Sequence, residues 1–319
     1  MRFIIKRLLQ GLGVLLGTLT LVFFIFSFVP DPARELAGQT ERESVVQAFR
    51  HKHGLDLPIY SRYIGFISNA AIGDLGSSYI TDRPVIDSIK GALPATLILA
   101  SVAMFFAAFF GIMIGLVLAI FPKSRIGDIV LSICALGMSA PSFVVAILVA
   151  WLFGYVLHSY THLPMTGGMI TVDPFEGPRL AWAHLILPAF TLGIRPLAVI
   201  IQLSRNSAIE VLGAPYIRTA RAKGLSRSRI LLNHVLRNSL NPVLTATSGW
   251  FASMLAGAVF VEFVFGWKGM GLLMFNALES GDLPIVMGCT LVISSIFVLI
   301  NVAVDLLYGI LDPRVRSSR

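Results

Sequence analysis

Six long apolar runs dominate the sequence, and they constrain the fold more than any other feature. A helix that crosses the hydrocarbon core of a bilayer needs about 20 mostly apolar residues, and each run reaches that length. Only 13% of the residues are charged, against about a quarter in a typical soluble domain. We therefore predict an all-α membrane protein with six transmembrane helices. The predicted spans are Leu8–Val29, Pro94–Phe121, Ile129–Leu157, His184–Ser204, Asn241–Phe263 and Val286–Gly309.

The basic residues indicate how these spans are oriented. The net charge is +8, and Lys and Arg concentrate in short cytoplasmic loops and tails of membrane proteins. The two short loops on the opposite side hold only Arg179 and Lys268. Both termini are therefore predicted to be cytoplasmic, and topology explains the basic charge better than binding to nucleic acid does. The predicted cytoplasmic clusters lie in residues 2–7, 123–125, 205–237 and 314–319.

The first apolar run follows a basic N-terminus, an arrangement that signal peptides share. It is longer than the apolar core of a signal peptide, about 7–15 residues, and no small-residue cleavage pattern ends it. We interpret this run as an uncleaved membrane anchor. Residues 1–93 then form an N-terminal span plus an outer segment, and residues 94–319 form a five-span core.

The outer segment, residues 30–93, is too long for a plain connector. Its apolar residues recur at helical spacing in two places, which predicts two short amphipathic helices. These helices either bind an outer partner protein or only cover the ends of the spans. The residues at helical spacing are Val45, Val46 and Phe49 in the first place, and Tyr60, Tyr63, Ile64 and Ile67 in the second.

The cytoplasmic loop between the fourth and fifth predicted spans, residues 205–239, contains a short helical pattern. Residues 216–223 suit a helix, and Gly224 suits its C-terminal cap, because glycine adopts the left-handed conformation without steric cost. A second helical stretch, Ser226–Asn238, follows and leads into the next span. A short helix held below the membrane can transmit movement from a bound protein to the spans. The alternative is a solvated basic loop.

The sequence of this loop resembles a known family. Residues 220–225 read Ala-Arg-Ala-Lys-Gly-Leu, which is similar to the Glu-Ala-Ala loop of ABC importer permeases in the dipeptide, oligopeptide and nickel transport family. Three positions depart from the expected pattern: Arg218 stands where the generic motif has glutamate, Arg237 where it has proline, and Lys268 where the family usually has proline. Further blocks resemble the same family in the same order, namely residues 54–60, 73–76, 93–97, 163–167, 185–189 and 305–314.

The resemblance implies a type I ABC importer permease fold with a cytoplasmic coupling helix, in a bacterial inner membrane. It also implies a second homologous permease, two cytoplasmic ATPase subunits, an extracytoplasmic substrate-binding protein and surrounding membrane lipid. ATP and Mg²⁺ would bind to the partner ATPases, since this chain has no GxxxxGK(S/T) phosphate loop. We expect neither catalytic residues nor a cofactor in this chain. The implied coupling residues are Tyr216, Arg218, Thr219, Ala220, Arg221, Ala222, Lys223, Gly224 and Leu225.

Arg195 lies near the middle of the fourth predicted span. An arginine at the centre of a membrane helix costs about 2.5–3.5 kcal/mol on insertion scales, so it should face an aqueous path or a polar partner. One hypothesis places Arg195 in the translocation path, where it meets a substrate carboxylate. The other pairs it with a carboxylate, or with backbone carbonyls freed by Pro188 or Pro196.

Other functions find less support in the sequence. His158 and His162 have a spacing that can ligate a metal, but no third ligand accompanies them, so we predict no metal site. A secondary transporter, the remote alternative, would show sites repeated in two inverted halves. An intramembrane enzyme would need a nucleophile and a base at membrane depth, and no HExxH or GxSxG motif is present. Di- and oligopeptides are the commonest cargo of the resembled family, with nickel chelates or another small solute as alternatives.

Overall fold

The structure is a computed structural model that describes residues 2–27, 43–173 and 177–311. Four helices are long and apolar enough to cross a membrane alone, and two further pairs, each bent at a short break, are long enough only when the two helices of the pair are combined. Counting each pair as one span gives six, in agreement with the predicted all-α membrane fold. The four helices that are sufficient alone lie in α1 (Arg2–Ser27), α5 (Val85–Ile120), α9 (Ala183–Gly213) and α15 (Leu283–Leu311).

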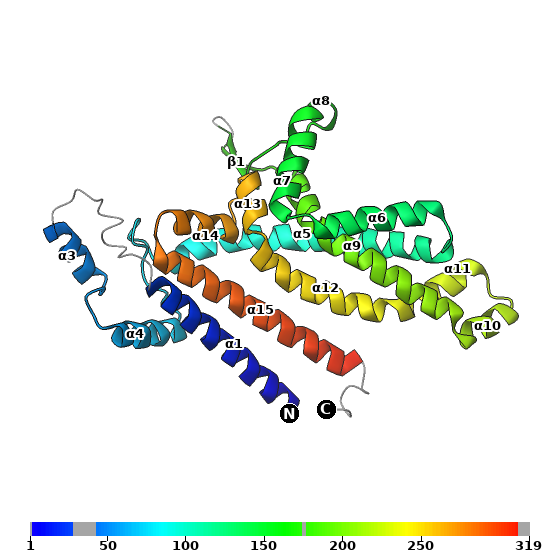
Figure 1. Ribbon diagram of the computed structural model, residues 1–319, viewed down its shortest axis with the longest axis horizontal. Coiled ribbons are helices and arrows are strands. Elements are labelled where there is room, and N and C mark those ends of the chain that lie inside the picture. The colour runs from blue at the N-terminus through cyan, green and yellow to red at the C-terminus, as the bar shows by residue number, and fades with distance from the viewer. Residues whose placement is uncertain (1, 28–42, 174–176, 312–319) are drawn as a thin grey trace. The chain divides into compact units, whose positions relative to one another are not determined.

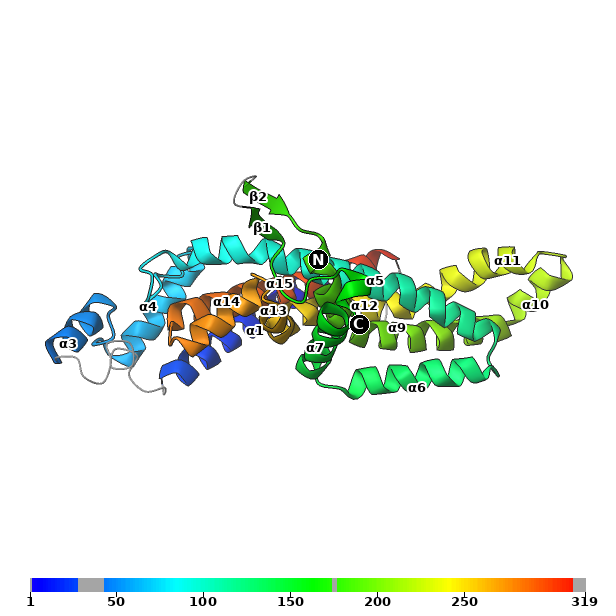
Figure 2. The same cartoon turned by 90° about the horizontal axis from the view of Figure 1, so that it is seen from above.

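The third predicted span is a bent pair instead of one straight helix. Its halves, α6 (Arg125–Ser139) and α7 (Ser142–Trp151), are bent by 113°. Pro141 explains the break, because proline lacks an amide hydrogen and disfavours the helical conformation of the residue before it. That residue, Ala140, is extended, with ψ 136°. In Figure 2, α7 turns sharply away from α6. After α7 the chain continues through the π-helical η1 (Leu152–Val156) and the short helix α8 (His158–Thr161).

The fifth predicted span is bent as well. Its halves, α12 (Arg237–Gly257) and α13 (Val259–Phe265), make an angle of 57° about Ala258. Pro242 lies inside α12 and away from this bend. The helix-breaking residue that the sequence offers in this span is therefore not the cause of the bend.

The chain forms two compact units, one of which contains both ends of the chain. Unit 1 comprises residues 1–96 and 268–319, and unit 2 comprises residues 97–267. The sequence predicts a different division, after residue 93, between a region with one span and a core with five spans. That division follows the order of the spans along the chain, and it stays a prediction.

Within unit 1, α1 and α15 pack side by side in opposite directions (Figure 1). Phe26, near the end of α1, packs against a core that includes Val286 and Cys289 near the start of α15. Near the other end of the pair, a Cβ atom added to Gly11 would lie 2.5 Å from Cγ1 of Val298. Glycine therefore permits the close approach of the two helices. The start of α1 and the end of α15 lie at the same end of the pair.

The outer segment contains two short helices at the predicted places, although Tyr60 and Ile64 of the predicted apolar positions are exposed. The helices are α3 (Glu43–Lys52) and α4 (Ile59–Ala71). The Tyr63 hydroxyl of α4 lies 2.7 Å from the Thr20 hydroxyl of α1, and the Tyr63 ring contacts Phe23 at 5.3 Å between centroids. The outer segment thus packs on α1, while its residues 30–42 lie outside the described residues.

The loop that follows α4 is tied to the last part of α3. Lys52 Nζ donates to Asp82 Oδ1 at 2.7 Å, and this hydrogen bond lowers the pKa of Asp82. The centroid of the His53 ring lies 4.7 Å from that of the Tyr79 ring and 4.4 Å from that of the Phe49 ring. Burial raises the pKa of the Tyr79 phenol, because the charged phenolate is disfavoured away from water.

A buried carboxylate joins the same loop to the start of α15. Asp282, only 3% exposed, accepts hydrogen bonds from the Ser78 hydroxyl and from the Tyr79 amide, the latter at 3.0 Å. Nearby, the amide of Met270 at the start of α14 (Met270–Glu279) donates to the Thr96 hydroxyl at 2.8 Å. Unit 1 is therefore held together by contacts between segments far apart in the sequence.

In unit 2, α9 packs closely on the second half of α5. A Cβ atom at Gly111 would lie 2.7 Å from Cγ2 of Ile200, and one at Gly115 would lie 2.6 Å from Cβ of Ser204. The GxxxG spacing of α5 therefore serves packing within this chain. Outside the spans, β1 (Ile170–Asp173) and β2 (Gly177–Leu180) form an antiparallel hairpin that the sequence does not predict.

Candidate functional site

The segment between α9 and α12 begins with the short helix α10 (Pro215–Ala222). Pro215 occupies the first helical position, where its missing amide hydrogen is not needed. The helix ends in a Schellman motif, in which the amide of Leu225 donates to the carbonyl of Ala220 (3.3 Å) and the amide of Gly224 to that of Arg221 (3.0 Å). Gly224 has φ 76°, which confirms the predicted glycine cap.

One face of α10 is buried against the ends of its neighbours in unit 2. Ile217 is 0% exposed and Ala220 is 6% exposed. Burying an aliphatic side chain contributes about 1.5–3 kcal/mol, so this contact fixes α10 to the helix ends that it touches. The cluster around Ile217 includes Leu116 and Ala119 of α5, Ala208 of α9, and Ile230 and Val235 of the segment that returns to α12.

The opposite face of α10 is exposed and basic. The next turn, α11 (Arg227–Ile230), extends this surface. A surface of this charge is complementary to an acidic protein surface. Among the predicted coupling residues, Tyr216, Arg218, Thr219, Arg221, Ala222, Lys223 and Gly224 are exposed, Leu225 is half-buried and Ala220 is buried. We call Arg218, Arg221, Lys223, Arg227 and Arg229, all exposed, the basic face.

The chain returns to the membrane through the π-helical η2 (Leu231–Leu236), which continues directly into α12. The stretch Ser226–Asn238, predicted to be helical, is thus helical, and its middle part is a π-helix, in which the backbone hydrogen bonds span five residues instead of four. Val235 of η2 is fully buried in the same cluster as Ile217. The packing therefore joins α10 to α5, α9 and the start of α12.

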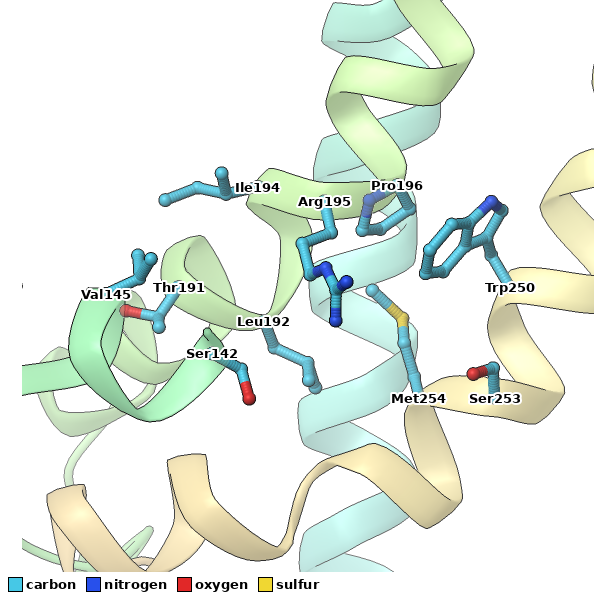
Figure 3. A pocket seen from close by; sticks show the side chains of 10 residues that line it. All are labelled: Ser142, Val145, Thr191, Leu192, Ile194, Arg195, Pro196, Trp250, Ser253 and Met254. Atoms are coloured by element: carbon cyan, nitrogen blue, oxygen red, sulfur yellow. The ribbon is translucent and has the colours of Figure 1, made fainter. Parts of the chain in front are cut away.

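Arg195 lies in a pocket of unit 2 between α7, α9 and α12 (Figure 3). The pocket has a volume of about 90 Å³. Among the described residues that line it, Arg195 alone carries a charge. Figure 3 shows its side chain pointing between Ser142 and Leu192 on one side and Ser253 and Met254 on the other. The lining residues are Ser142, Val145, Thr191, Leu192, Ile194, Arg195, Pro196, Trp250, Ser253 and Met254.

The guanidinium of Arg195 also contacts the end of α6. Its Nη2 donates to the carbonyl oxygen of Met138 at 3.3 Å. In an unbroken helix this carbonyl would accept from the amide of Ser142, but the break at Pro141 prevents that bond. Arg195 thus pairs with a freed carbonyl, as one of the two hypotheses expects, although the responsible proline is Pro141. A cation at a helix C-terminus is also favoured by the helix dipole.

Some features of the site are not evident from the sequence. Nothing in the sequence indicates that Trp250, Ser253 and Met254 lie beside Arg195, although hydroxyl residues gather in this part of α12.

His158 and His162, whose spacing could suit a metal, have their ring centroids 6.5 Å apart, and His158 Nδ1 lies 2.9 Å from the carbonyl oxygen of Leu163. Among the described residues, no group of three or more His, Cys, Asp and Glu side chains is placed to hold a metal.

These features define the class of the protein. Two bent spans and α9 line a mostly apolar pocket that contains a charged side chain, and a short amphipathic helix packs on the ends of the apolar helices. This combination is typical of a membrane transport permease.

The chain belongs to the family of binding-protein-dependent transport system inner membrane components. Residues 111–317 match that family, and residues 1–100 match the family of the corresponding N-terminal regions. The protein is therefore an integral inner-membrane component of a transport system.

Relatives cover almost the whole chain. A glutathione transport system permease protein of Escherichia coli is 36% identical over 317 residues, covering 99% of both chains. A di/tripeptide transport system permease protein of Pseudomonas aeruginosa is 36% identical over 333 residues, again covering 99% of both. Among solved structures, the inward-facing MetNI methionine ABC transporter has a TM-score of 0.54 at 20% identity, covering 71% of this chain and 97% of that chain. The fold is therefore that of a type I ABC importer permease.

Proposed function

We propose that this chain is the permease subunit of an ATP-driven, binding-protein-dependent importer of di- and oligopeptides. The observation that carries the proposal is the similarity over 99% of the chain to two permeases whose named cargoes, glutathione and di/tripeptides, are short peptides. The pocket around Arg195 supports it, because a peptide offers both a carboxylate and apolar side chains to such a lining.

The basic face of α10 and α11 docks on a cytoplasmic ATPase. In the complete transporter this chain pairs with a second homologous permease, two ATPases bind ATP and Mg²⁺, and an outer binding protein delivers the substrate. ATP-driven closure of the ATPases displaces α10. Because Ile217 is buried against α5, α9 and the segment that leads into α12, that displacement reaches the spans.

Both termini of the chain lie in the cytoplasm in this proposal. The antiparallel packing of α1 and α15 supports a common side for both ends. The cluster of Lys and Arg between residues 205 and 237 favours the cytoplasm as the side that α10 faces.

Reconstitution tests the proposal directly. The complete transporter would be placed in proteoliposomes and supplied with its binding protein, ATP and radiolabelled dialanine, glutathione or a nickel–histidine complex. We expect ATP-dependent uptake of at least one of the two peptides and none of the nickel complex. Uptake of the nickel complex alone would contradict peptide import, and uptake driven by an ion gradient without ATP would contradict the importer class.

A further inference from the structure

The pocket around Arg195 lies where two spans are interrupted. Ser142, which lines it, is the first residue of α7 after the 113° break, and Met254 lies shortly before the bend at Ala258. Interrupted helices are tolerated at membrane depth only where the freed backbone is buried in protein or lines a cavity. In many transporters such interruptions form the substrate site. The position of this pocket therefore favours contact with substrate.

The charge in the pocket selects the kind of group that binds there. Arg195 is the one charged side chain among its described lining residues, and an arginine carries five N–H donors. The contact with Met138 uses Nη2, so the rest of the guanidinium can still bind a carboxylate. Arginine and carboxylate form strong, charge-assisted and often bidentate hydrogen bonds. A cationic solute would instead be repelled.

The start of α7 adds to this preference. The carbonyl of Pro141 accepts from the amides of Val144 (3.1 Å) and Val145 (3.2 Å). The amides of Ser142 and Phe143 come before the first intrahelical acceptor they could use. They lie at the positive end of the helix dipole, which favours an anion. The Ser142 side chain, which lines the pocket, supplies a hydroxyl donor in addition.

We propose that this pocket is a carboxylate subsite of the translocation path, in which Arg195 and Ser142 bind the C-terminal carboxylate of the transported peptide. This inference rests on the proposed peptide import and names the part of the substrate that the permease itself recognises. Leu192, Val145 and Trp250 then contact the side chain next to that carboxylate. Arg195 then binds the Met138 carbonyl through Nη2 and the carboxylate through its other N–H donors.

The test compares a peptide with and without its terminal charge. Proteoliposomes that hold the complete transporter are supplied with saturated binding protein, ATP and radiolabelled dialanine or dialanine amide, and the initial uptake rates give an acid-to-amide ratio. Arg195→Gln keeps an N–H donor for the Met138 carbonyl but removes the charge. We expect its ratio to fall about tenfold, as for the loss of a charge-assisted hydrogen bond.

Two further variants serve as controls. Arg195→Lys keeps the charge, so its ratio should stay close to that of the wild type. Arg205→Gln removes a cation from the same helix at a position outside the pocket, and it should leave the ratio unchanged.

An unchanged ratio in Arg195→Gln, or an equal loss of both peptides, would overturn the inference and assign Arg195 to the end of α6 alone. Failure of the wild-type transporter to import both dialanine and glutathione would be a different result. It would overturn the proposed peptide function, and the carboxylate subsite with it.

Discussion

Gly224 shows how a single backbone conformation fixes the end of α10. Its φ of 76° is in the left-handed region, and a Cβ atom added there would meet nothing within 4 Å. A larger residue would therefore strain the backbone without colliding with a neighbour. For a β-branched residue this strain costs about 1–3 kcal/mol.

We predict that Gly224→Val abolishes substrate-stimulated ATP hydrolysis and transport while the protein still inserts into the membrane. The strained turn would change the angle at which α10 meets its ATPase. Membrane fractions, ATPase assays and uptake in proteoliposomes measure the three properties. Gly224→Asn is the matched control, because asparagine adopts the left-handed conformation more readily, and it should retain most activity. If the valine variant transports at the wild-type rate, the loop is only a connector and has no coupling role.

At the scale of secondary-structure elements, the contact of α10 with the helix ends depends on Ile217. This residue is the fully buried member of the inner face, packed among residues of α5, α9 and η2. An Ile→Ala change in a core costs about 2–5 kcal/mol through lost contacts and the cavity left behind. The helix has little stability of its own to offset this loss, because isolated helices shorter than about 12–15 residues are only marginally stable in water.

Ile217→Ala should therefore loosen α10 from the spans while leaving the basic face intact. We expect the ATPase to remain bound, with reduced stimulation of its activity by substrate, and faster hydrogen exchange across residues 215–225. Ile217→Val removes only one methyl group from the same buried position and should leave both measurements close to wild type. Protection from exchange that equals the wild type in Ile217→Ala would show that the contact does not hold α10 in place.

Elements set by local chemistry could be predicted from the sequence. The apolar runs, the two outer helices and the cap at Gly224 depend on nearby residues, and the structure has them. Pro141 indicates a helix break, but it does not set the 113° angle between α6 and α7, because α7 packs against α9 and α13. The pocket around Arg195 is lined by α7, α9 and α12, which lie far apart in the sequence, and no proline marks the bend at Ala258. Periodicity and propensity do not contain that information.

For the whole molecule, the arrangement of α1 and α15 predicts the membrane topology. Because the two helices are antiparallel and both are long enough to span the bilayer, we expect both chain ends on one side. Reporter fusions after Arg319 should indicate the cytoplasm, and fusions within residues 40–60 should indicate the opposite side. The same side for both positions would contradict the six-span arrangement.

The composition of unit 1 from residues 1–96 and 268–319 has a consequence for synthesis in the cell. The first helix leaves the ribosome early, whereas the helix against which it packs leaves almost last. At about 5–20 residues per second, α1 waits on the order of 15–60 s for α15. During that time Gly11 and its neighbours face lipid or the insertion machinery. A nascent chain that stops before α14 never completes this unit, so membrane proteases have an incomplete product to recognise and remove before it can assemble.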